Sequence, residues 1–169
     1  MRKYIKLIVC LLVVLTLWAI PFKVVVVIGN SMLPSLKNNQ LLLAVRTNNF
    51  SLNDIVVLKN DYNETIIKRI KFDENDVYYS LMSFDSEKIE VFDQHIGVMA
   101  EKYYEGNHNF LVMKHVVPRG YVYVLGDNSE NSDDSRRFGP VEKSVIMYKV
   151  INKWVCFHST LILLHGEWS

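Results

Sequence analysis

The chain has 169 residues, 50% of them hydrophobic and 22% charged, and its 19 Lys and Arg against 18 Asp and Glu leave a net charge of +1. A chain of this length buries one good-sized core, so we expect one domain with appendages rather than two large domains. The near-neutral charge argues against a nucleic-acid partner, because neutralising phosphates requires a basic face.

The first predicted element is an N-terminal membrane anchor. Basic residues at positions 2, 3 and 6 precede an uncharged run over residues 7–20. At ~1.5 Å per residue this run covers only ~21 Å of a ~30 Å hydrocarbon core, but residues 4 and 5 and a snorkelling Lys6 extend it to a span. A cleaved signal peptide is the alternative, although no A-x-A site follows the run. Residues 1–22 are therefore predicted to form a cytoplasmic tip and one transmembrane helix, with everything after Pro21 on the far side.

Residues 23–152 are predicted to form an extracytoplasmic, mainly β domain. Short runs rich in Val, Ile and Tyr alternate with segments that contain Asn, Asp, Gly and Ser, which is the pattern of strands and turns. The predicted strands are residues 23–28, 40–45, 54–59, 65–70, 76–81, 88–92, 121–126 and 144–150. One short helix is predicted over residues 96–104.

The last region, residues 153–169, is an apolar C-terminal segment. It is apolar for about eleven residues from Trp154, too few to span a bilayer, so a terminal core strand or an interfacial segment is expected. The two cysteines, Cys10 and Cys156, have the spacing of neither a metal knuckle nor a redox pair. We expect both to be small buried hydrophobic residues.

A serine can act as a nucleophile only beside a base that holds a free lone pair near neutral pH. None of the five histidines stands in the context of a triad, and the chain has no G-x-S-x-G elbow. The other base that serine uses is a lysine stripped of its proton by burial, and Lys68 interrupts the apolar run "TIIKRI". Lowering a lysine pKa from ~10.4 by ~3 units costs roughly 4 kcal/mol of desolvation, which an apolar β interior can impose. Taken alone, Lys68 also fits a strand lysine that snorkels to water.

The polar stretch "LGDNSENSDDSRRFGPV", residues 125–141, has the composition of a solvated loop. Its alternating Asp, Ser and Asn residues from Asp127 also suggest a calcium loop. That assignment fails, because the sixth position is Ser132 where Gly is required and the twelfth is Phe138 where a bidentate Glu is required. We predict no metal site and no cofactor.

Three short motifs follow one another along the chain. They are Ser31-Met32-x-Pro34, then Lys68-Arg69, then Gly126-Asp127-Asn128 with Asn131-Ser132-x-Asp134-Ser135-Arg136 and Gly139. Each short motif alone is weak, and Ser31 by itself fits a residue that only shapes the turn before a proline. In this order, behind an anchor, they resemble the boxes of the type I signal peptidases. The resemblance covers roughly residues 5–150, with a divergent middle over 72–114, and implies the β fold of that family behind one transmembrane helix.

The resemblance implies a catalytic pair. Ser31 attacks the scissile carbonyl and Lys68 is the general base, as in the bacterial enzymes, while the backbone N–H of Ser31 donates to the oxyanion. In some relatives a serine two positions before the nucleophile adds a hydroxyl donor, but here that position is Gly29. A lost oxyanion donor costs ~3 kcal/mol, so this difference matters.

The resemblance also implies a supporting network. Ser132 orients the Lys68 amine, and Asp134 with Arg136 forms a buried pair that holds the loop. As a surface pair the same two residues would be worth under ~1 kcal/mol. Asp127 is a further partner in this network.

Two more residues, Met32 and Pro34, are expected to shape the substrate cleft and the turn that exposes the nucleophile. The chain departs from the family after its Lys-Arg pair, where "IKFDENDV" replaces a glycine-rich turn ending in P-G-D. Ser35 stands where threonine is usual, which keeps the hydroxyl.

The function that the resemblance implies is a membrane-bound serine endopeptidase. It cuts signal peptides from secretory preproteins at the outer face of the cytoplasmic membrane, with the lipid bilayer and the preprotein as its partners. Two alternatives stay open. One is a self-cleaving regulator of DNA repair, which shares the Ser/Lys pair but is soluble. The other is an inactive relative that binds preproteins or a secretion partner, which the missing P-G-D turn favours.

Overall fold

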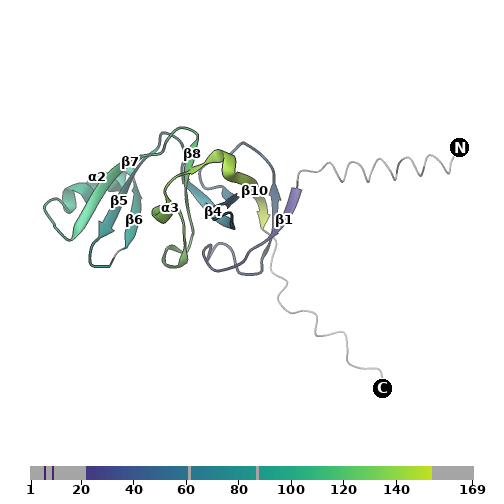
Figure 1. The fold of residues 1–169 in the computed structure, drawn as a ribbon, viewed down its shortest axis with the longest axis horizontal. Helices are drawn as coiled ribbons and strands as arrows, with labels where there is room; N and C mark the ends of the chain where they lie inside the picture. The colour runs from purple at the N-terminus through teal and green to yellow at the C-terminus, as the bar shows by residue number, and fades with distance from the viewer. Residues whose placement is uncertain (1–5, 7–8, 10–21, 61, 87, 154–169) are drawn as a thin grey trace, which may run out of the picture.

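Two antiparallel sheets make up most of the computed structural model, which describes residues 6, 9, 22–60, 62–86 and 88–153 (Figure 1). The strands of the larger sheet are β1 (Phe22–Val26), β2 (Leu41–Val45), β3 (Ile55–Lys59), β4 (Thr65–Phe72), β8 (Tyr121–Leu125), β9 (Val141–Glu142) and β10 (Ile146–Lys153). The smaller sheet contains β5 (Val77–Ser83), β6 (Ile89–Asp93) and β7 (Phe110–Val116). The helical elements are α2 (Gln94–Tyr103), η1 (Ser129–Asn131), α3 (Ser135–Phe138) and η2 (Lys143–Val145).

The prediction of a mainly β fold is confirmed. Every predicted strand coincides with an observed one to within a few residues, and α2 begins two residues before the predicted helix at position 96. The sequence analysis missed β7, β9 and the short helices. The last predicted strand begins at Ile146 rather than position 144, because residues 143–145 form η2.

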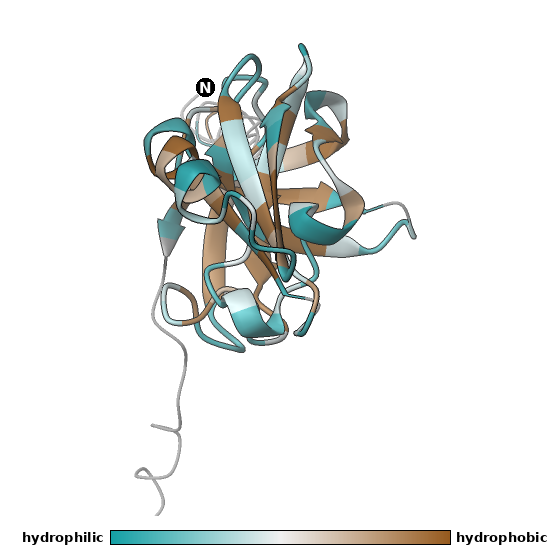
Figure 2. Cartoon of the chain, turned by 90° about the vertical axis from the view of Figure 1, so that its left-hand side faces the viewer, coloured by the Kyte–Doolittle hydropathy of each residue, from teal (hydrophilic) through white to brown (hydrophobic). Residues whose placement is uncertain are grey.

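The larger sheet has the order β1-β2-β10-β3-β4-β8-β9, so the last strand inserts between the second and the third. Alternate residues of β3 face opposite sides of this sheet. Val56 and Leu58 belong to one apolar cluster with Ile70, while Ile55 belongs to another with Met32. The two faces therefore carry separate cores, which appear brown on the strands in Figure 2.

The smaller sheet, with order β6-β5-β7, lies at the end of the molecule opposite β1 (Figure 1). Helix α2 covers one of its faces and is capped by Asp93, whose carboxylate accepts the Ile96 N–H at 3.0 Å. An aromatic cluster joins the sheet to the rest of the domain, and in it the rings of Tyr78 and Tyr123 lie 4.5 Å apart. This cluster fixes β5 against β8.

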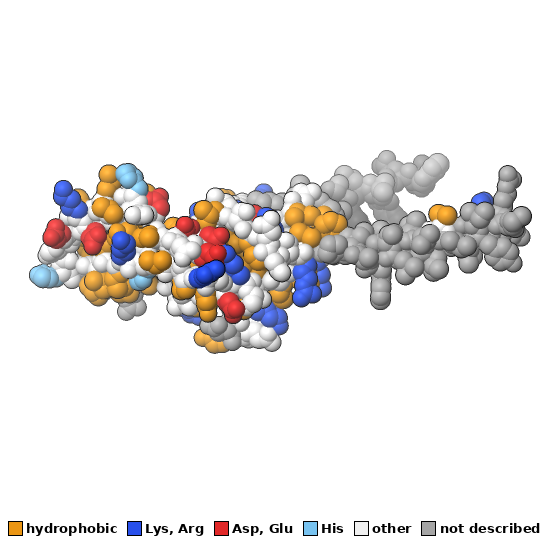
Figure 3. Space-filling view, turned by 90° about the horizontal axis from the view of Figure 1, so that it is seen from above, with side chains coloured by type: hydrophobic (Ala, Val, Ile, Leu, Met, Phe, Trp, Pro, Cys, Tyr) orange, Lys and Arg blue, Asp and Glu red, His pale blue; other side chains and the backbone are white. Residues whose placement is uncertain are grey.

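At the opposite end of the molecule, every second residue of β1 is apolar and exposed, and so is Ile28, which follows the strand. Phe22, Val24 and Val26 are about half exposed and Ile28 is 87% exposed, and Figure 3 shows hydrophobic surface there. Among the described residues, no helix combines the length and the apolar character needed to cross a bilayer. Of the predicted anchor over residues 1–22, the structure describes Lys6, Val9 and Phe22, and Phe22 begins β1. The two cysteines and residues 154–164 lie outside the described residues.

Gly97 sets the distance between α2 and β5. A Cβ at this position would lie inside van der Waals contact with the Tyr79 ring. We expect Gly97→Ala to lower the free energy of unfolding by about 1–3 kcal/mol, as overpacking does. Glu101→Ala, on the exposed side of the same helix, should change it by less than ~0.5 kcal/mol. Urea unfolding of the two variants measures both, and equal effects would contradict the role of Gly97.

Candidate active site

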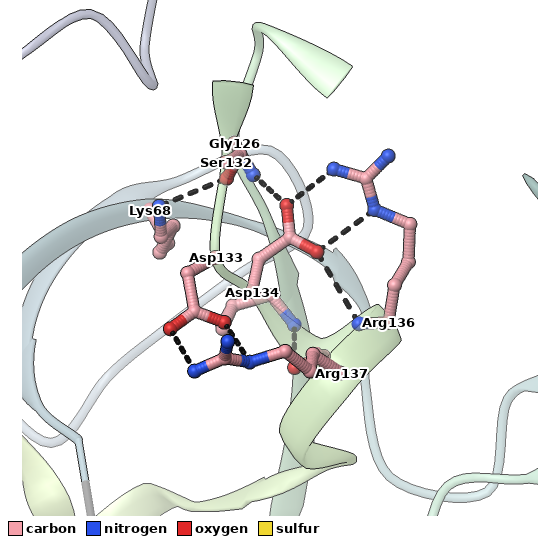
Figure 4. Close-up of polar contacts among 9 residues, drawn as sticks. Lys68, Gly126, Ser132, Asp133, Asp134, Arg136 and Arg137 are labelled. Carbon is pink, nitrogen blue, oxygen red and sulfur yellow. Dashed lines mark hydrogen bonds and ion pairs between the residues drawn. The ribbon is translucent and has the colours of Figure 1, made fainter. Parts of the chain in front are cut away.

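Lys68 is an ionisable residue inside the sheet. It lies in β4 on the same face as Ile66 and Ile70, opposite Val56 of β3, and is only 3% exposed. Its Nζ donates to Ser132 Oγ at 2.9 Å (Figure 4). Burial lowers the pKa of Lys68, because desolvation disfavours the ammonium form, although the nearby carboxylates oppose this shift.

Asp134 holds the loop that carries Ser132. Its carboxylate is 1% exposed and accepts two charge-assisted hydrogen bonds from Arg136, at 2.8 and 2.7 Å, and the Gly126 N–H at 2.9 Å (Figure 4). Burial acts to raise its pKa, but hydrogen bonds from Arg136, Gly126 and Ser132 outweigh burial and hold the pKa below its ordinary value. Asp134 is therefore ionised at neutral pH, and its negative charge acts to raise the pKa of Lys68.

The same loop is fixed on β8 by Ser135. This residue is 2% exposed, and its Oγ accepts the Val124 N–H at 3.0 Å. Asp134 also caps α3, since its side chain accepts the N–H of Arg136. The loop is thus held by the bond from Gly126 to Asp134, the bond from Val124 to Ser135 and the cap that Asp134 makes on α3.

Ser31 lies in a turn that packs against this loop. Its backbone carbonyl accepts the Asn128 N–H at 2.9 Å. A Cβ at Gly126 would collide with both the Ser31 carbonyl oxygen and the Ser132 hydroxyl, so only glycine allows the two segments to meet. Ser31, Gly126, Ser132 and Lys68 therefore lie in one small region. Within the described residues, the hydrogen bond of the Lys68 amine goes to Ser132, and none joins it to the Ser31 hydroxyl.

Asp127 makes a separate ion pair on the other side of Gly126. Arg69 donates two hydrogen bonds to the Asp127 carboxylate, at 2.8 and 2.6 Å, and a third to the Asn53 carbonyl. Burial opposes ionisation of Asp127, but Arg69 and the Ser35 hydroxyl hold its pKa below the ordinary value. The pair ties β4 directly to the end of β8 and belongs beside the Lys68 network rather than within it.

The two residues predicted to shape the cleft have different environments. Met32 is 1% exposed and packs in the second apolar core with Val27, Leu36 and Ile55. Pro34 is exposed on the turn. The turn that carries Ser31 is thus held by the buried Met32 side chain on one side and exposed to solvent at Pro34.

Three residues of the site were not singled out by the sequence analysis, although they stand in the quoted motif. They are Gly126, which allows the close approach, Asn128, which bonds the turn of Ser31, and Ser135, which fixes the loop. Nothing local distinguishes them from other loop residues, because their roles depend on how the chain folds back on itself, as in the contact of Gly126 with Ser31. In the part of the chain that the structure describes, no group of three or more His, Cys, Asp or Glu could hold a metal ion.

Comparisons with known proteins give a consistent result. A family model described as signal peptidase, peptidase S26, matches residues 1–155. The chain is 28% identical to mitochondrial inner membrane protease subunit 1 of Xenopus tropicalis, over 76% of this chain and 66% of that protein. It is 30% identical to signal peptidase I of Buchnera aphidicola, over 69% of this chain and 32% of that protein. The chain thus spans less than two thirds of either relative.

A comparison with solved structures also finds a similar chain. The crystal structure of a signal peptidase I from Enterococcus faecalis is 23% identical, with a TM-score of 0.39. The match covers 62% of this chain and 97% of the other.

The buried amine predicts a pH dependence of stability. The pKa of Lys68 is lower in the folded chain than its ordinary 10.5, so between these two values the unfolded chain binds more protons and stability rises with pH. Below the pKa of Lys68 in the folded chain, the free energy of unfolding is reduced by the cost of desolvating an ammonium group. We expect the free energy of unfolding of Lys68→Met to lack this rise, so that wild type becomes more stable relative to the variant as pH increases toward 10.5.

Urea unfolding of the full chain in detergent, repeated from pH 7 upward, measures the difference. Lys114→Met, which removes an exposed lysine of β7, reports the effect of losing one positive charge alone. A constant difference between wild type and Lys68→Met across this range would show that burial leaves the Lys68 amine unperturbed.

Proposed function

The chain belongs to the signal peptidase family, peptidase S26, and on that premise we propose that it is a membrane-bound serine endopeptidase that removes signal peptides from exported preproteins. Ser31 is the proposed nucleophile and Lys68 the general base. The observation that carries the proposal is a desolvated lysine amine, 2.9 Å from Ser132, beside the turn that bears Ser31. No cofactor enters the reaction.

The proposed reaction uses the neutral amine twice. Lys68 Nζ takes the Ser31 proton as Oγ attacks the substrate carbonyl, and it returns the proton to the leaving amine when the C–N bond breaks. It then takes a proton from the water that hydrolyses the acyl-enzyme, and Ser31 regains its hydrogen. Ser132 holds the amine between these steps. Burial supports this role, because it enriches the unprotonated form near neutral pH.

The supporting residues keep that amine in place. Asp134, neutralised by Arg136, positions Ser132 through the short loop that joins them, and Asp127 with Arg69 fixes the end of β8. The oxyanion is proposed to bind the Ser31 N–H. Gly29 offers no hydroxyl as a second donor.

The substrate is proposed to bind as an extended strand beside the active-site sheet. Main-chain hydrogen bonds would then supply the affinity, and shallow apolar pockets would select small side chains at the first and third positions before the cut. In this arrangement the buried Met32 would hold the turn from the core side, and the exposed Pro34 would border the cleft.

The proposed location is the cytoplasmic membrane, with the N-terminus inside and the catalytic domain on the outer face. Residues 1–22 would form the tip and anchor, 23–152 the catalytic domain and 153–169 an apolar tail. The exposed apolar side chains Phe22, Val24 and Val26 support the proposal, because they begin where the anchor is predicted to end.

A second candidate is a catalytically impaired relative that binds preproteins or a secretion partner. One observation favours it, since the Lys68 amine bonds Ser132 and, among the described residues, not Ser31. The departure from the P-G-D turn after Arg69 points the same way.

Mutation of the dyad separates the two candidates. Detergent-solubilised full chain is incubated with a labelled precursor, and the product is identified by mass spectrometry. We expect wild type to cut after a small residue, and Ser31→Ala and Lys68→Ala each to slow cleavage by roughly 10⁴-fold or more, because each removes a group that the reaction needs. The exposed Ser129→Ala is the matched control and should retain activity. Full activity in either dyad variant would refute the dyad, and tight binding without product in wild type would support the adaptor.

The pH profile of cleavage tests the role of the amine. Only unprotonated Lys68 can take the serine proton, so kcat/KM should rise with pH, with a midpoint below the ordinary lysine pKa of 10.5. The Asp133 carboxylate raises the pKa of Lys68, so Asp133→Asn should move this midpoint to lower pH. Asp133 is an exposed partner of Arg137 and lies outside the proposed dyad. A midpoint that stays fixed or moves upward would exclude Lys68 as the titrating base.

A further inference from the structure

Asn128 makes two hydrogen bonds to the turn that carries Ser31. Its backbone N–H donates to the Ser31 carbonyl at 2.9 Å, and its side-chain Nδ2 donates to the Asn30 carbonyl at 3.2 Å. The two peptide units on either side of Ser31 are therefore both held by one residue. That residue is 98 positions away from Asn30 in the chain.

The side-chain bond has a geometric consequence. A peptide unit is planar, so the Asn30 carbonyl and the Ser31 N–H lie in one plane and point in opposite directions. A donor that fixes the carbonyl oxygen therefore also fixes the direction of the N–H. It polarises the same unit as well, which strengthens the N–H as a donor.

The turn has an internal bond of its own, from the Leu33 N–H to the Asn30 carbonyl at 3.1 Å. That bond moves with the turn as a unit. Asn128 belongs instead to the loop between Gly126 and Ser132, and Ser132 accepts the hydrogen bond of Lys68. Its bonds therefore set the turn relative to the loop that holds the base.

We propose that Asn128 is a positioning residue that aims the Ser31 N–H at the oxyanion and keeps the nucleophile in register with Lys68. The inference rests on the proposed function. It gains weight from Gly29, which offers no side-chain donor, so that the direction of the Ser31 N–H matters more for the oxyanion. The Asn128 amide bonds the opposite edge of that peptide, and it therefore acts through Ser31 and does not touch the oxyanion.

The first test is Asn128→Asp, which keeps the shape and the backbone N–H but replaces the amide donor by an oxygen that repels the Asn30 carbonyl. We expect kcat for precursor cleavage by the detergent-solubilised full chain to fall about 10- to 100-fold with KM nearly unchanged, the effect of a small misplacement at a reacting centre. Asn128→Ala, which removes the donor without adding a charge, should give a loss in the same range. Ser129→Asp places a carboxylate at the exposed neighbouring position and should keep wild-type kcat.

A second readout does not depend on the amount of folded enzyme. A peptide aldehyde forms a tetrahedral adduct as Ser31 Oγ adds to its carbon and the serine proton passes to Lys68, whereas the matching peptide alcohol forms none. We expect Asn128→Asp to weaken binding of the aldehyde about 10- to 100-fold and to leave binding of the alcohol unchanged. Equal weakening of both ligands, or of neither, would overturn the inference.

A third readout separates this inference from the proposed function. The backbone amide ¹H and ¹⁵N resonances of Ser31 report the hydrogen bond on the preceding carbonyl, and they should move in Asn128→Asp but not in Ser129→Asp. If Ser31→Ala cleaves as well as wild type, the dyad fails, and these resonances alone decide whether Asn128 orients the peptide. Unmoved Ser31 resonances, or a kcat within twofold of wild type in an active enzyme, would reject the role of Asn128.

Discussion

A lysine amine enclosed in the face of a β-sheet is the constraint on which the rest of this site depends. Lys68 stands between Ile66 and Ile70 on one face of β4, where water cannot solvate an ammonium group. Two groups offset part of this loss of hydration: the ionised Asp134 stabilises the ammonium form, and the Ser132 hydroxyl accepts a hydrogen bond from the amine. Arg136 forms an ion pair with Asp134, and burial still lowers the pKa of the amine below its ordinary value although the nearby carboxylates oppose this shift.

These contacts require the loop after β8 and the turn of Ser31 to approach each other more closely than a side chain would allow. Gly126 is the point of approach, since any Cβ there would strike both the Ser31 backbone and the Ser132 hydroxyl. The loop after β8 can therefore present Ser132 to Lys68 and also hold the turn of Ser31. Close backbone packing, rather than a long side chain, brings the proposed nucleophile and base into one region.

The fold was predictable where side-chain pattern and strand coincide. Residues 54–59 and 65–70 are rich in branched apolar residues, and they form β3 and β4. Strand β7 escaped prediction because Lys114 and His115 break its alternation, and it is an edge strand that pairs with β5 alone. The insertion of β10 between β2 and β3, and the separation into two sheets, follow from pairings between distant segments that no local pattern encodes.

The sequence by itself determined which residues are proposed to carry the chemistry, because a serine before a proline turn, a lysine in an apolar run and a polar loop of fixed order are local patterns that can be read in chain order. Only the tertiary structure decided how they meet. The bond from Lys68 to Ser132 spans 64 positions and that from Asn128 to Asn30 spans 98, and each depends on the register of strands that pair across the sheet. A one-residue shift of β4 against β8 would turn Lys68 to the other face, so its partners are properties of the packed sheet and not of any segment alone.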